Sequence, residues 1–274
     1  MTSLPAVPLT LEGASVLHQM MRFRWTAWKA LAPAQREVVL EEAVATLGAM
    51  PGAMEGATHQ TAVYSLIGHK GDLMFVHFRK SFEELNQTEI AIARLRLSEF
   101  LEPATSYLSM VELGLYESTL KLYAGLAERG IEAHSAEWNQ EIETQLARQR
   151  QAMAQRLWPA IPDRKYICFY PMDRRRGESV NWYQVPMAER QRMMHEHGMV
   201  GRRYAGNVQQ IITGSIGFDD WEWGVDLFAD EPLVFKKLIY EMRFDEVSAV
   251  YALFGVFYVG VRVDVGNLPA LLKP

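Results

Sequence analysis

The chain contains a single cysteine, Cys168, among its 274 residues. One thiol cannot form a disulfide within the chain, and it cannot complete a thiolate cage for zinc or for an iron–sulfur cluster. The amino-terminal segment also lacks the basic start and sustained apolar core of a secretory signal. Because free thiols persist in reducing compartments, we expect a cytoplasmic protein.

The sequence has neither a strong excess of one charge nor a long uninterrupted apolar run. Lys and Arg number 28 against 33 Asp and Glu, so the net charge of −5 does not favour nucleic acid or an anionic membrane as a partner. The most apolar stretch, residues 247–263, is interrupted by a serine, two glycines and an arginine. This stretch is too polar for a membrane span and is predicted to be a buried strand.

Several sequence motifs are absent as well. The chain has no phosphate loop, Rossmann glycine pattern, HExxH, EF-hand or CxxCH motif. These absences disfavour nucleotide binding, zinc-protease chemistry and covalently attached haem.

Hydrophobic periodicity predicts an internal repeat. The first copy is expected to contain strands at 15–25, 61–68, 72–79 and 105–116, with helices at 33–50 and 81–101. The second copy is expected to contain strands at 165–172, 207–214, 220–229 and 251–263, with helices at 186–198 and 232–247. Each copy has the order β-α-β-β-α-β of a ferredoxin-like unit.

The predicted fold is therefore α+β, with two tandem ferredoxin-like units. The units are expected at 1–116 and 161–274, and residues 117–160 are predicted to form a helical connector. Two such sheets could pack face to face or close into a barrel, which would leave a cavity between a sheet and its helices. Unexpected polar residues concentrate in the second unit, so we expect the functional site there.

Two histidines lie on the predicted helix 186–198. His195 and His197 are two positions apart and point about 200° apart around a helix axis. His197 follows Met193 and Met194 on the apolar side, and Gly198 is expected to end the helix. A histidine on an apolar face is more often a satisfied core residue than a ligand. A single histidine is a poor zinc site but is sufficient for a porphyrin iron.

Tyr170 ends the predicted strand 165–172, on the same face as Tyr166 and Cys168 and directly before Pro171. A packed core tyrosine is the simpler interpretation. The functional alternative is a redox-active phenol beside a strong oxidant.

A dense group of arginines follows Tyr170 and the predicted helix. Its members are Arg174, Arg175, Arg176, Arg202 and Arg203, with Met172 nearby. Guanidinium groups bind carboxylates bidentately, so this group could hold a ligand with several carboxylates. It could equally be a solvated loop whose surface ion pairs contribute little.

Two further pairs of residues have alternative interpretations. Of Gln209 and Gln210, which face opposite sides of a predicted strand, one is expected to meet a ligand, a water or a neighbour. Trp221 and Trp223 alternate along the next strand and are predicted to pack in the core rather than to line a cofactor-binding site.

Five segments together resemble the chlorite dismutase family, and most closely its coproheme decarboxylase branch in Gram-positive and related bacteria. They are YPMDRRRGESVNWY, HGMVGRRYAG, NVQQIITGS, DDWEWG and YEMRFDEVSA. The resemblance covers roughly residues 60–265. It implies two ferredoxin-like copies per subunit, porphyrin binding in the second copy, and assembly as a homopentamer.

The resemblance also implies residue roles. His197 matches the proximal iron ligand, and Tyr170 matches a tyrosine that becomes a radical beside a propionate. Positions that match propionate-contacting residues are Met172, Arg174, Ser248 and Arg156, although Arg174 stands where lysine is common. Gln210 occupies the distal site, where chlorite-degrading relatives carry arginine, and this argues against chlorite chemistry.

The implied reaction is the peroxide-driven decarboxylation of two propionates of iron coproporphyrin III (coproheme). The product is haem b, formed through a three-propionate intermediate in haem biosynthesis, and the substrate supplies the redox metal without a separate cofactor. A transient contact with coproporphyrin ferrochelatase is a further expectation. A generic haem peroxidase, a chlorite-degrading enzyme and a non-enzymatic haem carrier remain as alternatives.

Overall fold

The computed structural model describes residues 5–50 and 58–274. The first copy of the repeat consists of β1 (Thr10–Phe23), α1 (Trp25–Ala30), α2 (Pro33–Ala49), β2 (Gln60–Ile67), β3 (Leu73–Arg79), α3 (Phe82–Ala93) and β4 (Leu101–Gly114). Helix α1 was not predicted. The predicted helix 81–101 ends at Ala93 and is followed by a separate 3₁₀ turn, Arg96–Phe100.

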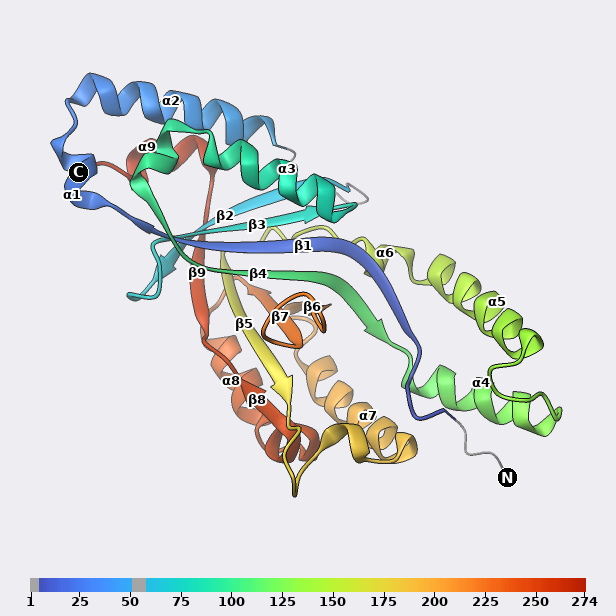
Figure 1. Cartoon of the computed structure of the whole chain (residues 1–274). Helices are drawn as coiled ribbons and strands as arrows, with labels where there is room; N and C mark the ends of the chain where they lie inside the picture. Colours follow the sequence, from blue (N-terminus) through green and yellow to red (C-terminus); the bar gives the residue numbers. More distant parts are fainter. Residues whose placement is uncertain (1–4, 51–57) are drawn as a thin grey trace.

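The segment between the copies is helical, as the sequence predicted. It forms α4 (Tyr116–Glu128), α5 (Ala136–Ala152) and α6 (Ala154–Leu157). Figure 1 shows α4 and α5 extending away from the sheet, on the side where the described chain begins.

The second copy repeats the order of the first. It consists of β5 (Tyr166–Arg174), α7 (Met187–Arg203), β6 (Gln209–Gly214), β7 (Trp223–Ala229), α8 (Leu233–Met242), β8 (Ala252–Phe254) and β9 (Tyr258–Val263), and a short α9 (Leu268–Leu271) follows.

Several boundaries in this copy differ from the prediction. Strand β5 continues to Arg174 rather than ending at 172, β7 begins at Trp223 rather than at 220, and α8 ends at Met242 rather than at 247.

Helix α7 does not end at Gly198 but continues to Arg203. The extra turn buries Val200 in the apolar cluster beneath the helix, which favours continuation over a glycine cap. The strand expected at 251–263 is likewise interrupted. Its residues 247–251 form a π-helical turn, and the strand breaks at Gly255, where an added Cβ would lie 2.8 Å from the Pro171 ring.

The strands of both copies join in one antiparallel sheet. Its order is β7-β6-β4-β1-β3-β2-β9-β5-β8, and a further pairing of β5 with β7 closes the sheet into a barrel. The two copies meet where β2 pairs with β9 and where β4 pairs with β6. The predicted α+β fold of two ferredoxin-like units is confirmed. The unit boundaries at 116 and 160 stay a prediction, because a single sheet unites both copies.

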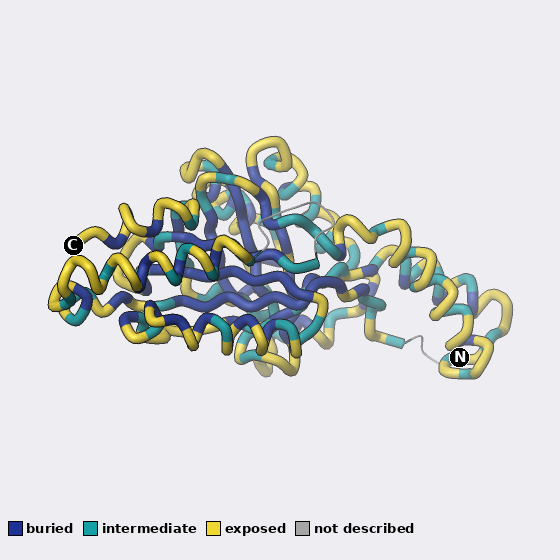
Figure 2. Tube along the Cα trace, turned by 90° about the horizontal axis from the view of Figure 1, so that it is seen from above, coloured by how far each residue is buried: buried dark blue, intermediate teal, exposed yellow. Residues whose placement is uncertain are grey.

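The closed sheet separates three apolar layers. Side chains such as Val16, Phe78 and Phe169 fill the barrel interior. Helices α2, α3 and α9 cover the outer face of the first copy, whereas α7 and α8 cover that of the second. The helix pairs lie on opposite sides of the barrel (Figure 1), and the buried strands run between exposed helix surfaces (Figure 2). No helix in the described ranges has the length and apolarity needed to cross a bilayer.

Candidate functional site

His197 lies on the face of α7 that meets the segment following α8. Its Nδ1 donates a hydrogen bond to Oδ2 of Asp245 across 2.8 Å, and 26% of its side chain is exposed. His195, on the opposite face, is exposed as predicted. Because Asp245 holds the proton on Nδ1, the lone pair of Nε2 remains free to coordinate a metal ion.

Ser248 holds Asp245 in place. Its backbone N–H donates to Oδ1 of Asp245 at 2.8 Å, and its hydroxyl donates to Oδ2 at 3.2 Å. Burial opposes ionisation of Asp245, but these hydrogen bonds and those from His197 bring its pKa below the usual value. Asp245 therefore stays ionised beside the imidazole. Sequence analysis missed this residue, although it lies within the YEMRFDEVSA segment.

One face of β5 presents three of the candidate residues to α7. Tyr170, Met172 and Arg174 alternate along this strand and so share a face. Tyr170 is 3% exposed, and its ring stacks on Phe257 with centroids 4.4 Å apart. Burial raises the pKa of Tyr170 well above its usual value, so the phenol is held in its neutral form.

Arg174 is a buried cation without an ion-pair partner in the described part of the chain. Its side chain lies over the Trp182 ring, 5.1 Å from the centroid, and one Nη lies 3.6 Å from the Met194 sulfur. The other Nη forms no hydrogen bond within the described chain, although Arg174 is only 8% exposed. Burial lowers the pKa of this guanidinium group. A buried unpaired charge is costly, so this position is suited to an anionic ligand.

The remaining members of the arginine group that the sequence suggested as a carboxylate site do not converge on Arg174. Arg176 pairs with Glu222 at 3.3 Å and Arg203 pairs with Glu241 at 2.7 Å. Arg175 and Arg202 are exposed. The structure therefore replaces the expected cluster with a single inward-facing guanidinium, since the other side chains are exposed, and two of them pair with the carboxylates of Glu222 and Glu241.

Gln210 faces α7 from β6. Its amide nitrogen lies 3.4 Å from the position that a Cβ on Gly201 would occupy, one helical turn after His197. The absence of a side chain at Gly201 gives this amide room beside the helix. Gln209, on the other face, accepts a hydrogen bond from Arg164 at 3.0 Å. Of the two glutamines, Gln209 is therefore the one that forms a hydrogen bond with a protein neighbour.

Arg156 lies apart from the other candidates. It is exposed on α6, which packs against β1 and β4 of the first copy. Within the described ranges no hydrogen bond, ion pair or cation–π contact joins its side chain to them. Its predicted role with a propionate stays a prediction.

The site consequently combines three kinds of group around one apolar cluster. The cluster contains Cys168, Tyr170, Val200, Val225, Leu227, Phe235, Leu238 and Met242. Beside it lie a carboxylate-supported imidazole nitrogen, a buried unpaired guanidinium and a buried phenol. An iron porphyrin with carboxylate side chains matches this donor set, because it needs an axial nitrogen, an apolar surface and a cation for its carboxylates.

Comparison with known proteins gives a consistent result. Residues 36–263 match the model of the family described as Chlorite dismutase. The structure is similar to that of a heme-binding protein from Thermus thermophilus, with 37% identity, a TM-score of 0.83 and coverage of 98% of each chain. It also shares the fold of chlorite dismutase from Candidatus Nitrospira defluvii in complex with imidazole, with 15% identity, a TM-score of 0.70 and coverage of 96% of each chain.

Proposed function

Because the chain belongs to the chlorite dismutase family, we propose that it binds coproheme and uses hydrogen peroxide to convert two of its propionates to vinyl groups, giving haem b in haem biosynthesis. The observation that carries this proposal is the shared face of β5, on which the buried phenol of Tyr170 and the unpaired guanidinium of Arg174 both point towards α7. The similarity to a heme-binding protein supports the choice of ligand.

In this proposal His197 holds the substrate iron through Nε2. Asp245 accepts the Nδ1 hydrogen, which fixes the ring orientation and makes Nε2 a stronger donor. Arg174 offers its unpartnered Nη to a propionate, and Met172 lies between Arg174 and Tyr170 on the same face. Ser248 contacts Asp245 here, and its contact with a propionate, like that of Arg156, is part of the proposal.

With peroxide, the bound iron porphyrin supplies the oxidising power for the reaction. Tyr170 transfers its proton and an electron together, since its raised pKa disfavours loss of the proton alone. The resulting radical takes a hydrogen atom from the propionate β-carbon. The peroxide-oxidised porphyrin then accepts a second electron as the bond to the carboxylate breaks, so that carbon dioxide leaves and a vinyl group remains.

The reaction balances for each propionate. One peroxide accepts two electrons and two protons and becomes two waters, while the propionic acid side chain loses carbon dioxide and two hydrogens. Two such turns give haem b through the three-propionate intermediate. Gln210 faces the helix as a neutral amide, so it can hydrogen-bond an oxidant without adding charge.

The family resemblance also leads us to propose a homopentamer located in the cytoplasm, with transient contact to the coproporphyrin ferrochelatase that supplies coproheme. These proposals rest on the resemblance and not on the geometry of the site.

Loading the purified protein with iron coproporphyrin III and titrating hydrogen peroxide tests the proposed reaction. Porphyrin mass, followed by chromatography and mass spectrometry, should show stepwise loss of two carboxyl groups ending at haem b. Tight binding with bleaching of the porphyrin would instead indicate a peroxidase, and binding with unchanged coproheme would indicate a carrier. Adding chlorite in parallel should produce no oxygen, because Gln210 stands in place of arginine.

A further inference from the structure

Glu222 is a buried carboxylate next to the end of β5. It is 6% exposed and directly precedes β7, whose pairing with β5 ends where Met172 lies opposite Trp223. Beyond this pair, the backbone N–H of Arg174 donates a hydrogen bond to Oε2 of Glu222 at 2.9 Å. The carboxylate therefore takes the place of a strand carbonyl at the point where the ladder between β5 and β7 stops.

Two further groups contact the same carboxylate. Nε of Arg176 lies 3.3 Å from Oε1, and the hydroxyl of Tyr183 forms a hydrogen bond with Glu222. Burial, together with this hydrogen bond, raises the pKa of Tyr183 well above its usual value, so the hydroxyl keeps its proton and acts as the donor. Three donors thus satisfy a carboxylate whose burial would otherwise be costly.

These contacts join the two arms of the hairpin that follows β5. The chain reverses direction between Gly177 and Val180, where the N–H of the first donates to the carbonyl of the second at 2.9 Å. Glu222 contacts the outgoing arm through the N–H of Arg174 and the returning arm through the hydroxyl of Tyr183. The carboxylate therefore holds the two arms at a fixed separation.

The hairpin also determines where the guanidinium group of Arg174 lies. The ring centroid of Trp182, which directly precedes Tyr183, is 5.1 Å from the guanidinium carbon, and one Nη is 3.6 Å from the sulfur of Met194. Because Glu222 fixes the backbone of Arg174 and the residue next to Trp182, it sets both the origin of the side chain and the ring on which it packs. The other Nη has no partner in the described chain, so it is available to a ligand.

Glu222 does not neutralise the cation that it holds. In the described part of the chain its ion pair is with Arg176, and none joins it to the guanidinium group of Arg174. One carboxylate oxygen accepts the backbone N–H of Arg174, while the other faces the exposed side chain of Arg176. The positive charge of Arg174 is therefore left for an anionic ligand.

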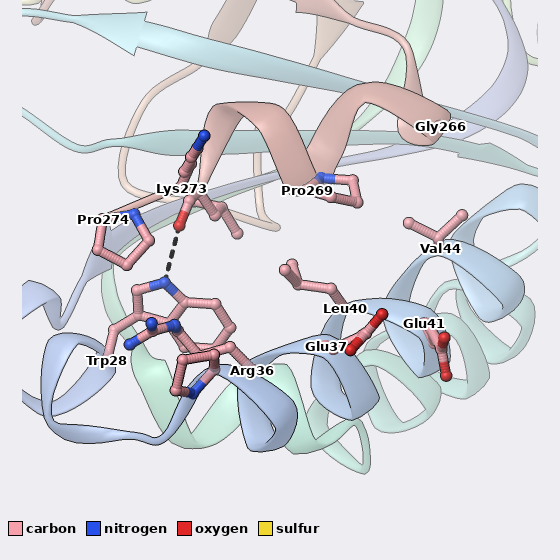
Figure 3. Close-up of a pocket in the computed structure, with 12 residues that line it drawn as sticks. Trp28, Arg36, Glu37, Leu40, Glu41, Val44, Gly266, Pro269, Lys273 and Pro274 are labelled. Atoms are coloured by element: carbon pink, nitrogen blue, oxygen red, sulfur yellow. Dashed lines mark hydrogen bonds between the residues drawn. The ribbon is translucent and has the colours of Figure 1, made fainter.

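Glutamates at a pocket elsewhere in the molecule show the effect of burial. This pocket has a volume of about 640 Å³ and lies between α2 and the carboxyl-terminal segment around α9 (Figure 3). Glu37 and Glu41 line it from exposed positions on α2, and Arg36 and Lys273 also belong to its wall. Water can satisfy exposed carboxylates of this kind. Glu222 is buried and takes its donors from the chain, so its contacts impose a defined geometry on the groups that it binds.

We propose that Glu222 is a positioning residue of the porphyrin site. It holds the guanidinium group of Arg174 where a propionate can reach it, through the backbone of Arg174 and the turn that carries Trp182, without contacting the porphyrin itself. This role rests on the proposed function, in which Arg174 binds a propionate. Although Glu222 lies in the DDWEWG segment, the family resemblance assigned no role to it.

A cycle of single and double substitutions, measured by titrating the full chain with coproheme, tests this role. Glu222→Ala should weaken coproheme binding by about ten-fold or more, because the backbone of Arg174 and the turn lose their shared acceptor. In the Arg174→Met background the same substitution should change the affinity by less than about two-fold, since the group that it positions is gone. A general loosening of the fold would instead weaken binding in both backgrounds.

Two matched variants separate positioning from charge and from stability. Glu222→Gln keeps an acceptor oxygen for the backbone N–H of Arg174 but removes a negative charge near the guanidinium group, so coproheme should bind as tightly as to the parent or more tightly. Asp72→Ala removes a half-buried carboxylate that accepts the backbone N–H of Phe23 at 2.7 Å in the first copy. This variant loses the same kind of contact but should retain the coproheme affinity of the parent.

Hydrogen exchange in the ligand-free protein examines the positioning without porphyrin. Mass spectrometry of peptides covering residues 172–183 should show about ten-fold faster exchange in Glu222→Ala, because the N–H of Arg174 loses its acceptor, and parent-like exchange in Glu222→Gln. If Glu222→Ala does not fold, Tyr183→Phe replaces it in both measurements. That substitution cuts the link to the turn while keeping the carboxylate, so a smaller effect of about three-fold is expected.

The positioning role is overturned if Glu222→Ala binds coproheme like the parent, if it weakens binding equally with and without Arg174, or if Glu222→Gln binds as weakly as Glu222→Ala. Unchanged exchange across residues 172–183 would also contradict it. A parent protein that does not bind coproheme would contradict the proposed function as well, and the exchange measurement would still show whether Glu222 fixes this segment.

Discussion

His197 and Asp245 lie 48 positions apart in the chain, yet their side chains are joined by a 2.8 Å hydrogen bond. One residue is on α7 and the other follows α8, so this bond links the two helices that cover the second copy of the repeat. It also leaves Nε2 of the imidazole free. The bond between these residues therefore prepares the proposed iron ligand before a porphyrin arrives.

Asp245→Asn should weaken the bond between His197 and iron. The neutral amide can accept the Nδ1 hydrogen, but it no longer increases the donor strength of Nε2 through its charge. We expect coproheme affinity or turnover to fall by about 10- to 100-fold, with a shift in the absorption spectrum of the ferric complex. Glu246→Gln is the matched control, because Glu246 is exposed and pairs with Arg192 at 2.7 Å. Equal effects of both substitutions would contradict a specific role for Asp245.

Tyr170→Phe should leave coproheme binding intact and abolish decarboxylation. The substitution removes only the phenolic hydroxyl, so the stacking on Phe257 is preserved. Coproheme absorption measures binding, and mass spectrometry after peroxide addition measures product. Tyr166→Phe, on the same face of β5 but at the start of the strand, should retain turnover. Full turnover by the Tyr170 variant would exclude it as the radical residue.

Arg174→Met should stabilise the ligand-free protein and weaken coproheme binding. Removing a buried unpaired cation should raise the free energy of unfolding by about 1 kcal/mol or more. Losing a charged contact to a propionate should weaken binding by about ten-fold or more. Chemical denaturation and titration with coproheme measure the two effects. Arg175→Met, at the exposed neighbouring position, should change neither quantity. If the Arg174 variant bound coproheme normally, the anion-binding role would be wrong.

His77→Gln should reduce the acid sensitivity of the fold. Burial, together with the nearby charges of Arg79 and His18, lowers the pKa of His77 to about 3 in the native state, against 6.5 ordinarily. Between these values the unfolded chain binds more protons than the native protein, so stability falls as the pH decreases. The slope contributed by His77 is about 1.4 kcal/mol per pH unit.

Denaturation of the parent and the His77 variant between pH 4 and pH 7 measures this contribution. We expect the number of protons taken up on unfolding to differ by about one per molecule between the two proteins. His69→Gln alters an exposed histidine and should retain the slope of the parent. Parallel stability curves for the parent and the His77 variant would contradict the expected linkage.

Gly255→Ala should destabilise the protein by about 1–3 kcal/mol, because overpacking forces the surrounding atoms to move. The added Cβ would lie 2.8 Å from the Pro171 ring and 3.0 Å from the Pro171 carbonyl oxygen. Gly48→Ala, near the end of α2 where an added Cβ meets nothing within 4 Å among residues 5–50 and 58–274, should instead stabilise by about 0.5–1 kcal/mol. Thermal unfolding compares both variants, and a neutral Gly255→Ala would show that this strand break tolerates a side chain.

Local patterns identified most of the elements and several residues of the candidate site. The apolar spacing around His197 indicated its inward face, and alternation along the predicted strand 165–172 placed Tyr170 on the same face as Tyr166 and Cys168. Arg174 was expected in a loop after this strand, and the structure places it on β5 with Tyr170 and Met172. The same patterns failed at Gly198 and Gly255. In the first case the helix continues and buries Val200, and in the second the strand is interrupted where Gly255 packs closely against Pro171.

Sequence by itself determined the order of helices and strands, because hydrophobic periodicity is a property of neighbouring residues. Only the tertiary structure decided that the strands of both copies close into one sheet, which arginine turns inward, and that Asp245 meets His197. These outcomes depend on contacts between distant segments and on competition among similar side chains for a few carboxylates. The sequence shows which side chains could form these pairs, but the free energy of the packed fold determines which pairs form.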